Sequence, residues 1–244
     1  MLSLIFAEGQ RPDLDAIAAL ASVPGSVMPF AISHIPDPDC AGPAPAQGWV
    51  ELLAGGLTFD LHGLAHGQPS AYPAPGALLG LAEAPAGEAL ALQPAPHLAD
   101  GPGMLPAVRV LAGIGTRLAG LPGVLAAHWG PASCWMTIKY YCGVVTEWLD
   151  GGAFPALGLT SLRREPDGAM TSLGLDFFIG QELRFEPDRR LPPAAIAKAA
   201  VRLVHSLVES GPLRARTEYA GPDGIVLLVE PVRQGRLLRV TVQR

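Results

Sequence analysis

The sequence predicts an α+β protein made of two ferredoxin-like halves, in which mixed or antiparallel sheets are covered by about four helices. Short runs of alternating apolar residues, typical of half-buried strands, recur along the 244 residues. Amphipathic segments with helical spacing separate these runs. The order strand, helix, two strands, helix, strand describes residues 2–129 and can be traced again from residue 124 onward. We therefore divide the chain at 1–130 and 131–244, with one continuous mixed sheet as the alternative.

The first half is punctuated by recognisable helix and turn signals. Pro12 suits the first position of a helix, and the acidic residues after it favour the positive end of the helix dipole. Two apolar runs on either side of Ala54-Gly55-Gly56 predict a hairpin. The expected elements are a strand at Leu2–Phe6, a helix from Pro12, a strand at Val27–Ile35, hairpin strands at Trp49–Leu53 and Leu57–Leu61, a helix at Met104–Leu118 and a strand at Val124–Trp129.

Glycines and prolines set two further expectations for this half. In the helix at 104–118, Gly113 and Gly115 permit close approach of a neighbouring element, at a cost of about 1 kcal/mol each relative to alanine. Residues 67–103 are rich in proline and glycine, and this stretch is longer than connections in compact domains usually are. We expect it to form a lid or an irregular cover with a helical turn at Leu78–Glu83.

The second half is expected to hold two helices and a larger set of strands. Ser133 is a suitable N-cap for a helix that ends at Gly151-Gly152, and a helix of clear amphipathic period follows at Pro192–Glu209. Alternating runs on both sides of a turn at residues 166–168 predict a sheet block from Phe154 to Phe185. The remaining expected strands are Thr217–Tyr219, Ile225–Val229 and Leu237–Val242.

Part of this sheet block resembles a known family. Residues 172–178, SLGLDFF, followed by residues 182–185, ELRF, resemble the C-terminal motif of an uncharacterised bacterial family catalogued as domain of unknown function 4261. The Phe154-Pro155 start of the preceding strand also fits, whereas Ile179 stands where that family has glycine and Gly180 comes one position later. The resemblance implies a fold neighbourhood and no catalytic residue.

Composition excludes several classes of function. The formal charge of −5, from 17 basic and 22 acidic side chains, disfavours nucleic-acid binding, because a phosphate backbone is repelled at long range. No uninterrupted apolar stretch reaches the roughly 20 residues of a bilayer helix, so no membrane segment is expected. Three cysteines, Cys40, Cys134 and Cys142, are too few for a disulfide scaffold and favour a reducing cytoplasm. Almost all of the basic residues are arginine, with Lys139 and Lys198 as the lysines, and this preference is typical of a GC-rich bacterial genome.

Four polar residues form a candidate pocket: Asp60, His62, His66 and His128. The His62 and His66 pair would share a helix face and could bind zinc, but alternation in the preceding run predicts a strand, where four residues span about 13 Å. We therefore expect no metal and no cofactor. No serine lies in a G-x-S-x-G turn, so no catalytic residue is predicted, and we favour a protein that is not an enzyme.

Aromatic residues supply a candidate interface. Trp135, Tyr140 and Trp148 lie on the helix expected after Ser133, and tryptophan and tyrosine often anchor protein contacts. The sequence is thus interpreted as a non-catalytic adaptor or regulatory module that binds another protein, with a homodimer as one form of that contact. The alternative is a small-molecule-binding or hydrolytic domain whose pocket lies between the two halves, beside the loop at 67–103.

Overall fold

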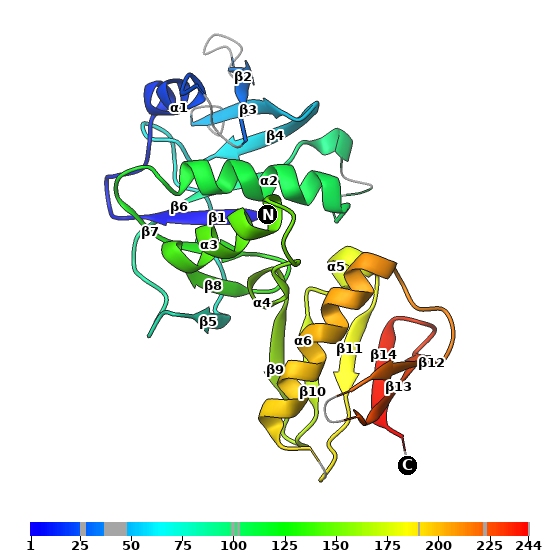
Figure 1. Cartoon of the computed structure of the whole chain (residues 1–244). Helices are drawn as coiled ribbons and strands as arrows, with labels where there is room; N and C mark the ends of the chain where they lie inside the picture. The colour runs from blue at the N-terminus through cyan, green and yellow to red at the C-terminus, as the bar shows by residue number, and fades with distance from the viewer. Residues whose placement is uncertain are drawn as a thin grey trace. The chain divides into compact units, whose positions relative to one another are not determined.

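The computed structural model describes residues 1–24, 28–36, 48–98, 101, 103–189, 191–221 and 224–243. Cys40 and Val27 therefore lie outside the described residues. The chain forms two compact units, Met1–Gly152 and Ala153–Arg244, each with its own sheet (Figure 1). The α+β class is confirmed, and the alternative of one continuous sheet is wrong because the strands form two separate sheets.

Unit 1, Met1–Gly152, contains an eight-stranded sheet with the strand order β2-β3-β4-β6-β1-β7-β8-β5. All neighbouring strands are antiparallel except β5 and β8. The strands are β1 (Leu2–Phe6), β2 (Ala31–His34), β3 (Trp49–Ala54), β4 (Leu57–His62), β5 (Ala77–Leu79), β6 (Glu88–Pro94), β7 (Val124–Trp129) and β8 (Cys134–Thr137). The helices are α1 (Leu14–Ala21), α2 (Leu105–Leu118) and α3 (Ile138–Leu149), with a 3-10 turn η1 (Pro96–Leu98).

Helices α2 and α3 pack against one face of this sheet, in front of β1 and β7 in Figure 1. The expected close approach at Gly115 is confirmed, because an added Cβ there would collide with the side chains of Leu2 in β1 and Tyr141 in α3. The hydroxyl of Tyr141 donates to Ala112 O in α2 at 2.9 Å. Arg109 ties the two helices further, since its guanidinium donates to Trp148 O and Leu149 O and lies 4.8 Å from the centroid of the Trp148 ring.

Two segments of unit 1 differ from the sequence-based expectation. Residues 67–103 contain the strands β5 and β6 in place of an irregular cover, and β6 is a central strand that pairs with both β1 and β4. The helix expected from Ser133 begins at Ile138, with Thr137 as its N-cap, and residues 134–137 form β8 instead. Because β8 pairs with β7 and α3 packs on α2, the division between the units falls at Gly152 and not at residue 130.

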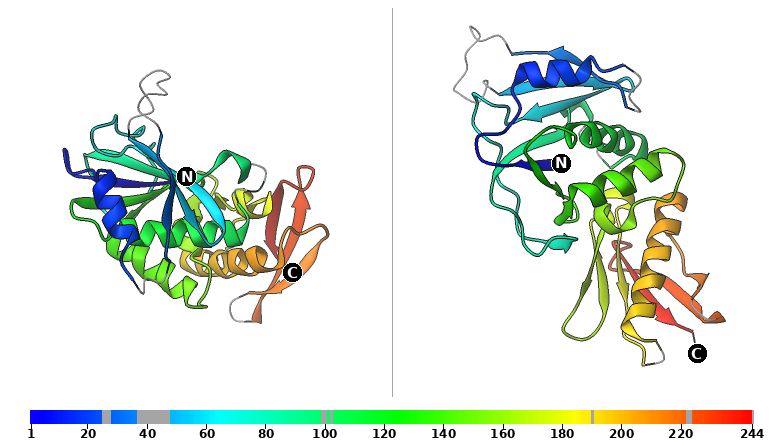
Figure 2. Two further views of the ribbon diagram at one scale, coloured as in Figure 1. Left: turned by 90° about the horizontal axis from the view of Figure 1, so that it is seen from above. Right: turned by 60° about the vertical axis from the view of Figure 1, so that its left-hand side comes forward.

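Unit 2, Ala153–Arg244, contains a six-stranded sheet with the strand order β12-β13-β14-β11-β10-β9. Its strands are β9 (Ser161–Arg164), β10 (Met170–Leu173), β11 (Glu182–Phe185), β12 (Thr217–Ala220), β13 (Val226–Val232) and β14 (Leu237–Val242). Its helices are α4 (Ala156–Leu159), α5 (Asp176–Ile179) and α6 (Pro193–Ser210). Both views in Figure 2 show α6 along one face of this sheet, where it contacts β11. A ferredoxin-like topology is confirmed for neither unit.

The segments 172–178 and 182–185 have a structural explanation in unit 2. The Glu182 carboxylate accepts hydrogen bonds from the Ser172 hydroxyl, from Gly174 N at 2.6 Å and from Asp176 N at 3.4 Å. Gly174 has a φ of 87°, which favours glycine at the turn between β10 and α5. Burial raises the pKa of Glu182. These contacts make Glu182 the anchor of the loop that joins β10 to β11.

Candidate functional site

A cluster of aromatic and polar side chains lies on the face of the unit 1 sheet that is turned away from α2. Leu2 contacts α2 through Gly115, and side chains alternate along a strand, so Ser3 points to the opposite face. Cross-strand register then places one row of residues on that opposite face: Trp49, His62, Ala91, Ser3, His128 and Trp135. Glu51, Asp60 and Gln93 occupy the adjacent row. We call the group Trp49, Glu51, Asp60, His62 and Gln93 the Trp49 face.

The half-buried indole of Trp49 is the centre of this face. Its ring lies between two imidazoles, with centroid separations of 5.6 Å to His34 and 5.9 Å to His62. His34 comes from the edge strand β2, whereas His62 ends β4. Three strands therefore hold the three rings side by side.

Asp60 supplies the buried carboxylate of the Trp49 face. Its side chain is 8% exposed, and Oδ2 lies 4.0 Å from His62 Nε2. Loss of hydration on burial raises the pKa of Asp60, and the nearby Glu51 adds to that rise, while His62 opposes it. Glu51 faces Asp60 directly across β3 and β4, so two carboxyl groups share this part of the sheet.

His62 is more accessible than its carboxylate neighbour, with 39% of its side chain exposed. Burial lowers the pKa of His62, and Asp60 partly offsets that effect. Gln93 Nε2 lies 3.4 Å from His62 Nε2. The imidazole is thus favoured in its neutral form near pH 7 and provides a hydrogen-bonding group at the margin of the site.

The other two predicted pocket residues lie elsewhere. His66 is exposed, has a φ of 69° and belongs to a turn after β4 whose carbonyl groups at residues 63, 64 and 67 accept hydrogen bonds from Arg11. His128 lies on the same sheet face as His62, but β6 and β1 separate β4 from β7, a spacing of about 14 Å. Only Asp60 and His62 are brought together.

The end of the row at His128 is covered by residues 70–88. The Trp135 indole donates to Ala74 O at 3.1 Å, and Tyr72 lies over it with ring centroids 5.5 Å apart. His128 is 4% exposed, and its ring centroid lies 4.8 Å from that of Trp135. Burial lowers the pKa of His128 to about 4. Among the described residues, neither ring nitrogen of His128 has a hydrogen-bond partner.

The predicted aromatic interface is reassigned by burial. Trp135 is fully buried in β8, and Trp148 is 4% exposed at the end of α3. Both belong to the core of unit 1, because β8 pairs in the sheet and α3 packs on α2. Of the three predicted residues only Tyr140 is partly exposed. These residues therefore do not form the aromatic contact surface that the sequence predicts.

Trp49, Glu51 and Gln93 were missed by the sequence-based interpretation. The expected hairpin contained the signal for Trp49, because a turn at Gly55-Gly56 places Trp49 opposite His62. Gln93 had no such signal, since β6 lies inside a stretch that is rich in proline and glycine. Among the side chains that the structure describes, no three from His, Cys, Asp and Glu gather as metal ligands.

None of the described helices combines the length and apolar character that a bilayer crossing needs. Comparison with family models, with curated proteins and with solved structures gave no match to this chain. The functional inference therefore depends on the side chains of the described residues.

Proposed function

We propose that this protein is a non-catalytic binding module whose Trp49 face receives a lysine or arginine side chain of a partner protein. The observation that carries the proposal is a half-buried indole placed beside two carboxyl groups, Asp60 and Glu51, on a sheet face. Aromatic rings attract cations through their quadrupole, and tryptophan is enriched among residues that dominate binding energy. An aromatic platform with adjacent negative charge suits a cationic side chain.

The protonation states of the site support a cationic partner. A neutral His62 does not repel an incoming ammonium or guanidinium group, and burial favours that neutral form. Asp60 is the group whose charge attracts the ligand, and its raised pKa means that acidification neutralises it earlier than an ordinary aspartate. Binding is therefore expected to weaken as the pH falls towards the pKa of Asp60.

Hydrogen bonding on this face argues against the hydrolytic alternative. The Ser70 hydroxyl donates to the backbone carbonyl of His62 at 3.0 Å and not to its ring. Two further hydroxyl groups lie near the site, but Ser33 donates to Glu51 Oε1 at 2.7 Å, and Thr58 lies 3.4 Å from His97 Nε2. Neither is hydrogen-bonded to the imidazole of His62, which would be the base of a nucleophilic mechanism.

Cys134 and Cys142 are free thiols, which supports our further proposal of a reducing cytoplasm as the working compartment.

Peptide binding tests the proposal directly. The full chain is titrated with two arrays of nonapeptides. The basic array carries lysine or arginine at every second position, and the acidic array carries aspartate or glutamate at those positions. Trp49 is the most exposed tryptophan, because Trp129, Trp135 and Trp148 are at most 4% exposed, so intrinsic fluorescence reports on the site. We expect basic peptides to change this fluorescence and Asp60→Asn to weaken their binding about tenfold.

Two variants act as controls. Trp49→Phe keeps an aromatic ring and is expected to retain part of the affinity, whereas Trp49→Ala is expected to abolish it, with binding followed by anisotropy of a labelled peptide. Equal binding of basic peptides by the wild-type protein and Asp60→Asn, with the fold intact by circular dichroism, would contradict the proposal.

A further inference from the structure

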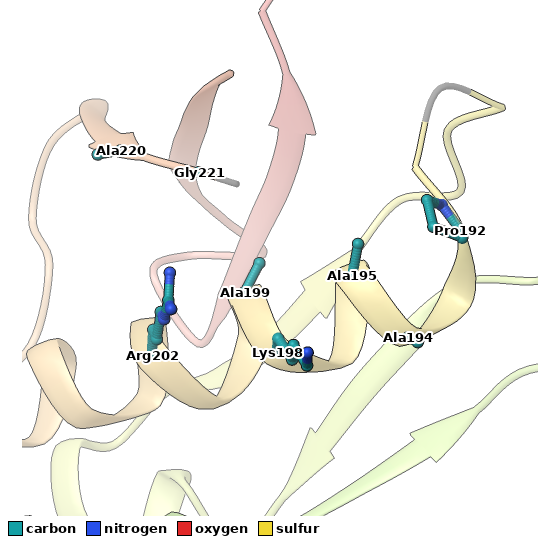
Figure 3. Close-up of a pocket in the computed structure, with 8 residues that line it drawn as sticks. All are labelled: Pro192, Ala194, Ala195, Lys198, Ala199, Arg202, Ala220 and Gly221. Carbon is teal, nitrogen blue, oxygen red and sulfur yellow. The ribbon is translucent and has the colours of Figure 1, made fainter. Parts of the chain in front are cut away.

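Unit 2 has a hollow of about 430 Å³ between α6 and the end of the edge strand β12. Figure 3 shows Ala195, Ala199 and Arg202 along one side of α6, with Ala220 and Gly221 across the gap. The hollow follows from the geometry of the unit. A helix about 10 Å wide covers roughly two strands spaced 4.8 Å apart, so α6 alone does not cover six strands. The short helices α4 and α5 pack beside α6, and α4 contacts β9 at the far edge from β12.

Two of the described side chains that line the hollow are cationic. Lys198 and Arg202 line it from successive turns of α6, and both side chains are exposed. No carboxylate of the described residues lies within ion-pair distance of either cation. The small side chains of Ala195 and Ala199 leave space between these cations and the strand. An anionic group is the complement that this lining favours.

The strand beside the hollow has unpaired backbone groups. β12 lies at the edge of its sheet and pairs with β13 alone among the described strands. Gly221 N donates to Ile225 O at 2.7 Å, so by antiparallel alternation the N–H and C=O groups of Glu218 and Ala220 point away from β13. The Glu218 carboxylate lies on the opposite face of the sheet from α6, because its neighbour Tyr219 pairs with the inward-facing Leu227.

We propose that this groove binds an extended acidic segment of a partner protein, which adds to the unit 2 sheet beside β12. Backbone groups of Glu218 and Ala220 would hydrogen-bond the added strand, as in strand addition at other sheet edges. Alternate acidic side chains of the segment would then reach Lys198 and Arg202. The Trp49 face lies in unit 1 and has the opposite charge preference, so this groove is a second and independent docking surface.

The experiment uses the full chain and the acidic and basic nonapeptide arrays in separate binding measurements. We expect acidic peptides to bind and Lys198→Glu with Arg202→Glu to weaken that binding at least tenfold. Arg163→Glu with Arg164→Glu, an equal change of charge at two exposed positions of β9, is the matched control and is expected to leave the affinity within about twofold. Inorganic phosphate is titrated as a competitor, to distinguish a peptide groove from a simple anion site.

Backbone recognition has its own test. Ala220→Pro removes an outward-pointing N–H and is tolerated at a sheet edge, so it is expected to weaken acidic peptides at least fivefold while the fold persists. Amide shifts of Glu218 and Ala220 in nuclear magnetic resonance spectra should move on titration. The proposal is overturned if acidic peptides do not bind, if Arg163→Glu with Arg164→Glu has the effect of the α6 double variant, or if phosphate binds and peptides do not. These outcomes concern acidic peptides alone. A protein that fails to bind basic peptides at the Trp49 face could therefore still confirm or overturn this proposal.

Discussion

His62 and His128 show at the scale of single residues how burial decides the chemistry of one side-chain type. Both lie in the same cross-strand row of the unit 1 sheet. His62 keeps 39% of its side chain exposed beside Asp60, whereas His128 is 4% exposed beneath residues that cover Trp135. Burial lowers the pKa of both, and it lowers that of His128 to about 4. His62 remains available to a ligand, and His128 is a core residue.

We predict that His128→Phe makes the protein less sensitive to acid. The pKa of His128 falls from 6.5 to about 4 on folding, so the unfolded chain binds more protons between those values. The wild-type protein therefore loses stability as the pH falls from about 6.5 to 4, by up to about 3 kcal/mol from this residue. The His128→Phe variant does not lose this stability, because phenylalanine does not titrate.

Urea unfolding of both proteins at several pH values checks this prediction. The readout is how the difference in unfolding free energy between variant and wild type changes with pH. The larger phenylalanine ring alters packing, and that effect shifts the difference by the same amount at every pH. The difference should rise in favour of His128→Phe below pH 6.5. A difference that stays constant from pH 7 to 4.5 would show that His128 is protonated in the folded protein without penalty.

Neighbouring elements explain where local sequence patterns were sufficient and where they were misleading. The hairpin of β3 and β4 and the helix α6 were predicted because a Gly-Gly turn and a 3.6-residue period are local signals. The strand β6 was missed, since its flanking prolines and glycines indicate a loop while its pairing with β1 and β4 is long-range. In the same way, pairing with β7 makes residues 134–137 a strand, although their apolar residues continue the helical spacing of α3.

The contact of α2 with β1 supplies a prediction at this scale. Gly115→Ala should destabilise unit 1 by about 1–3 kcal/mol, because the added methyl group collides with Leu2 and Tyr141 despite the better helix propensity of alanine. Gly143→Ala in α3 is the matched control, since no atom lies within 4 Å of its added Cβ. That variant should gain about 0.5–1 kcal/mol. Thermal melts of both variants measure the difference, and equal shifts would contradict the close packing of α2.

At the scale of the whole molecule, each unit has its own sheet and its own buried core. Leu111 in α2 and Leu203 in α6 are 2% and 3% exposed, so each is a core residue of its unit. Compact units with separate cores are expected to unfold as separate cooperative steps. All four tryptophans lie in unit 1, which gives a spectroscopic signal for that unit.

Leu203→Ala is predicted to lower the stability of unit 2 by about 2–5 kcal/mol, through loss of buried surface and a residual cavity. In denaturant, far-ultraviolet circular dichroism should then show an earlier transition that tryptophan fluorescence does not follow. Leu111→Ala should instead move the fluorescence transition. If Leu203→Ala moves both signals together, the two units unfold as one cooperative system.

The sequence by itself determined the α+β class, the ends of α2 and the presence of Asp60 and His62 on the polar side of a strand, because apolar periodicity and turn residues act over a few positions. Tertiary structure alone decided that His128 lies three strands away from His62, that Trp135 and Trp148 are core residues, and that Lys198 and Arg202 border a hollow beside β12. These outcomes depend on strand order and on which helix covers which part of a sheet. Both are set by contacts between residues distant in the chain, which no local pattern encodes.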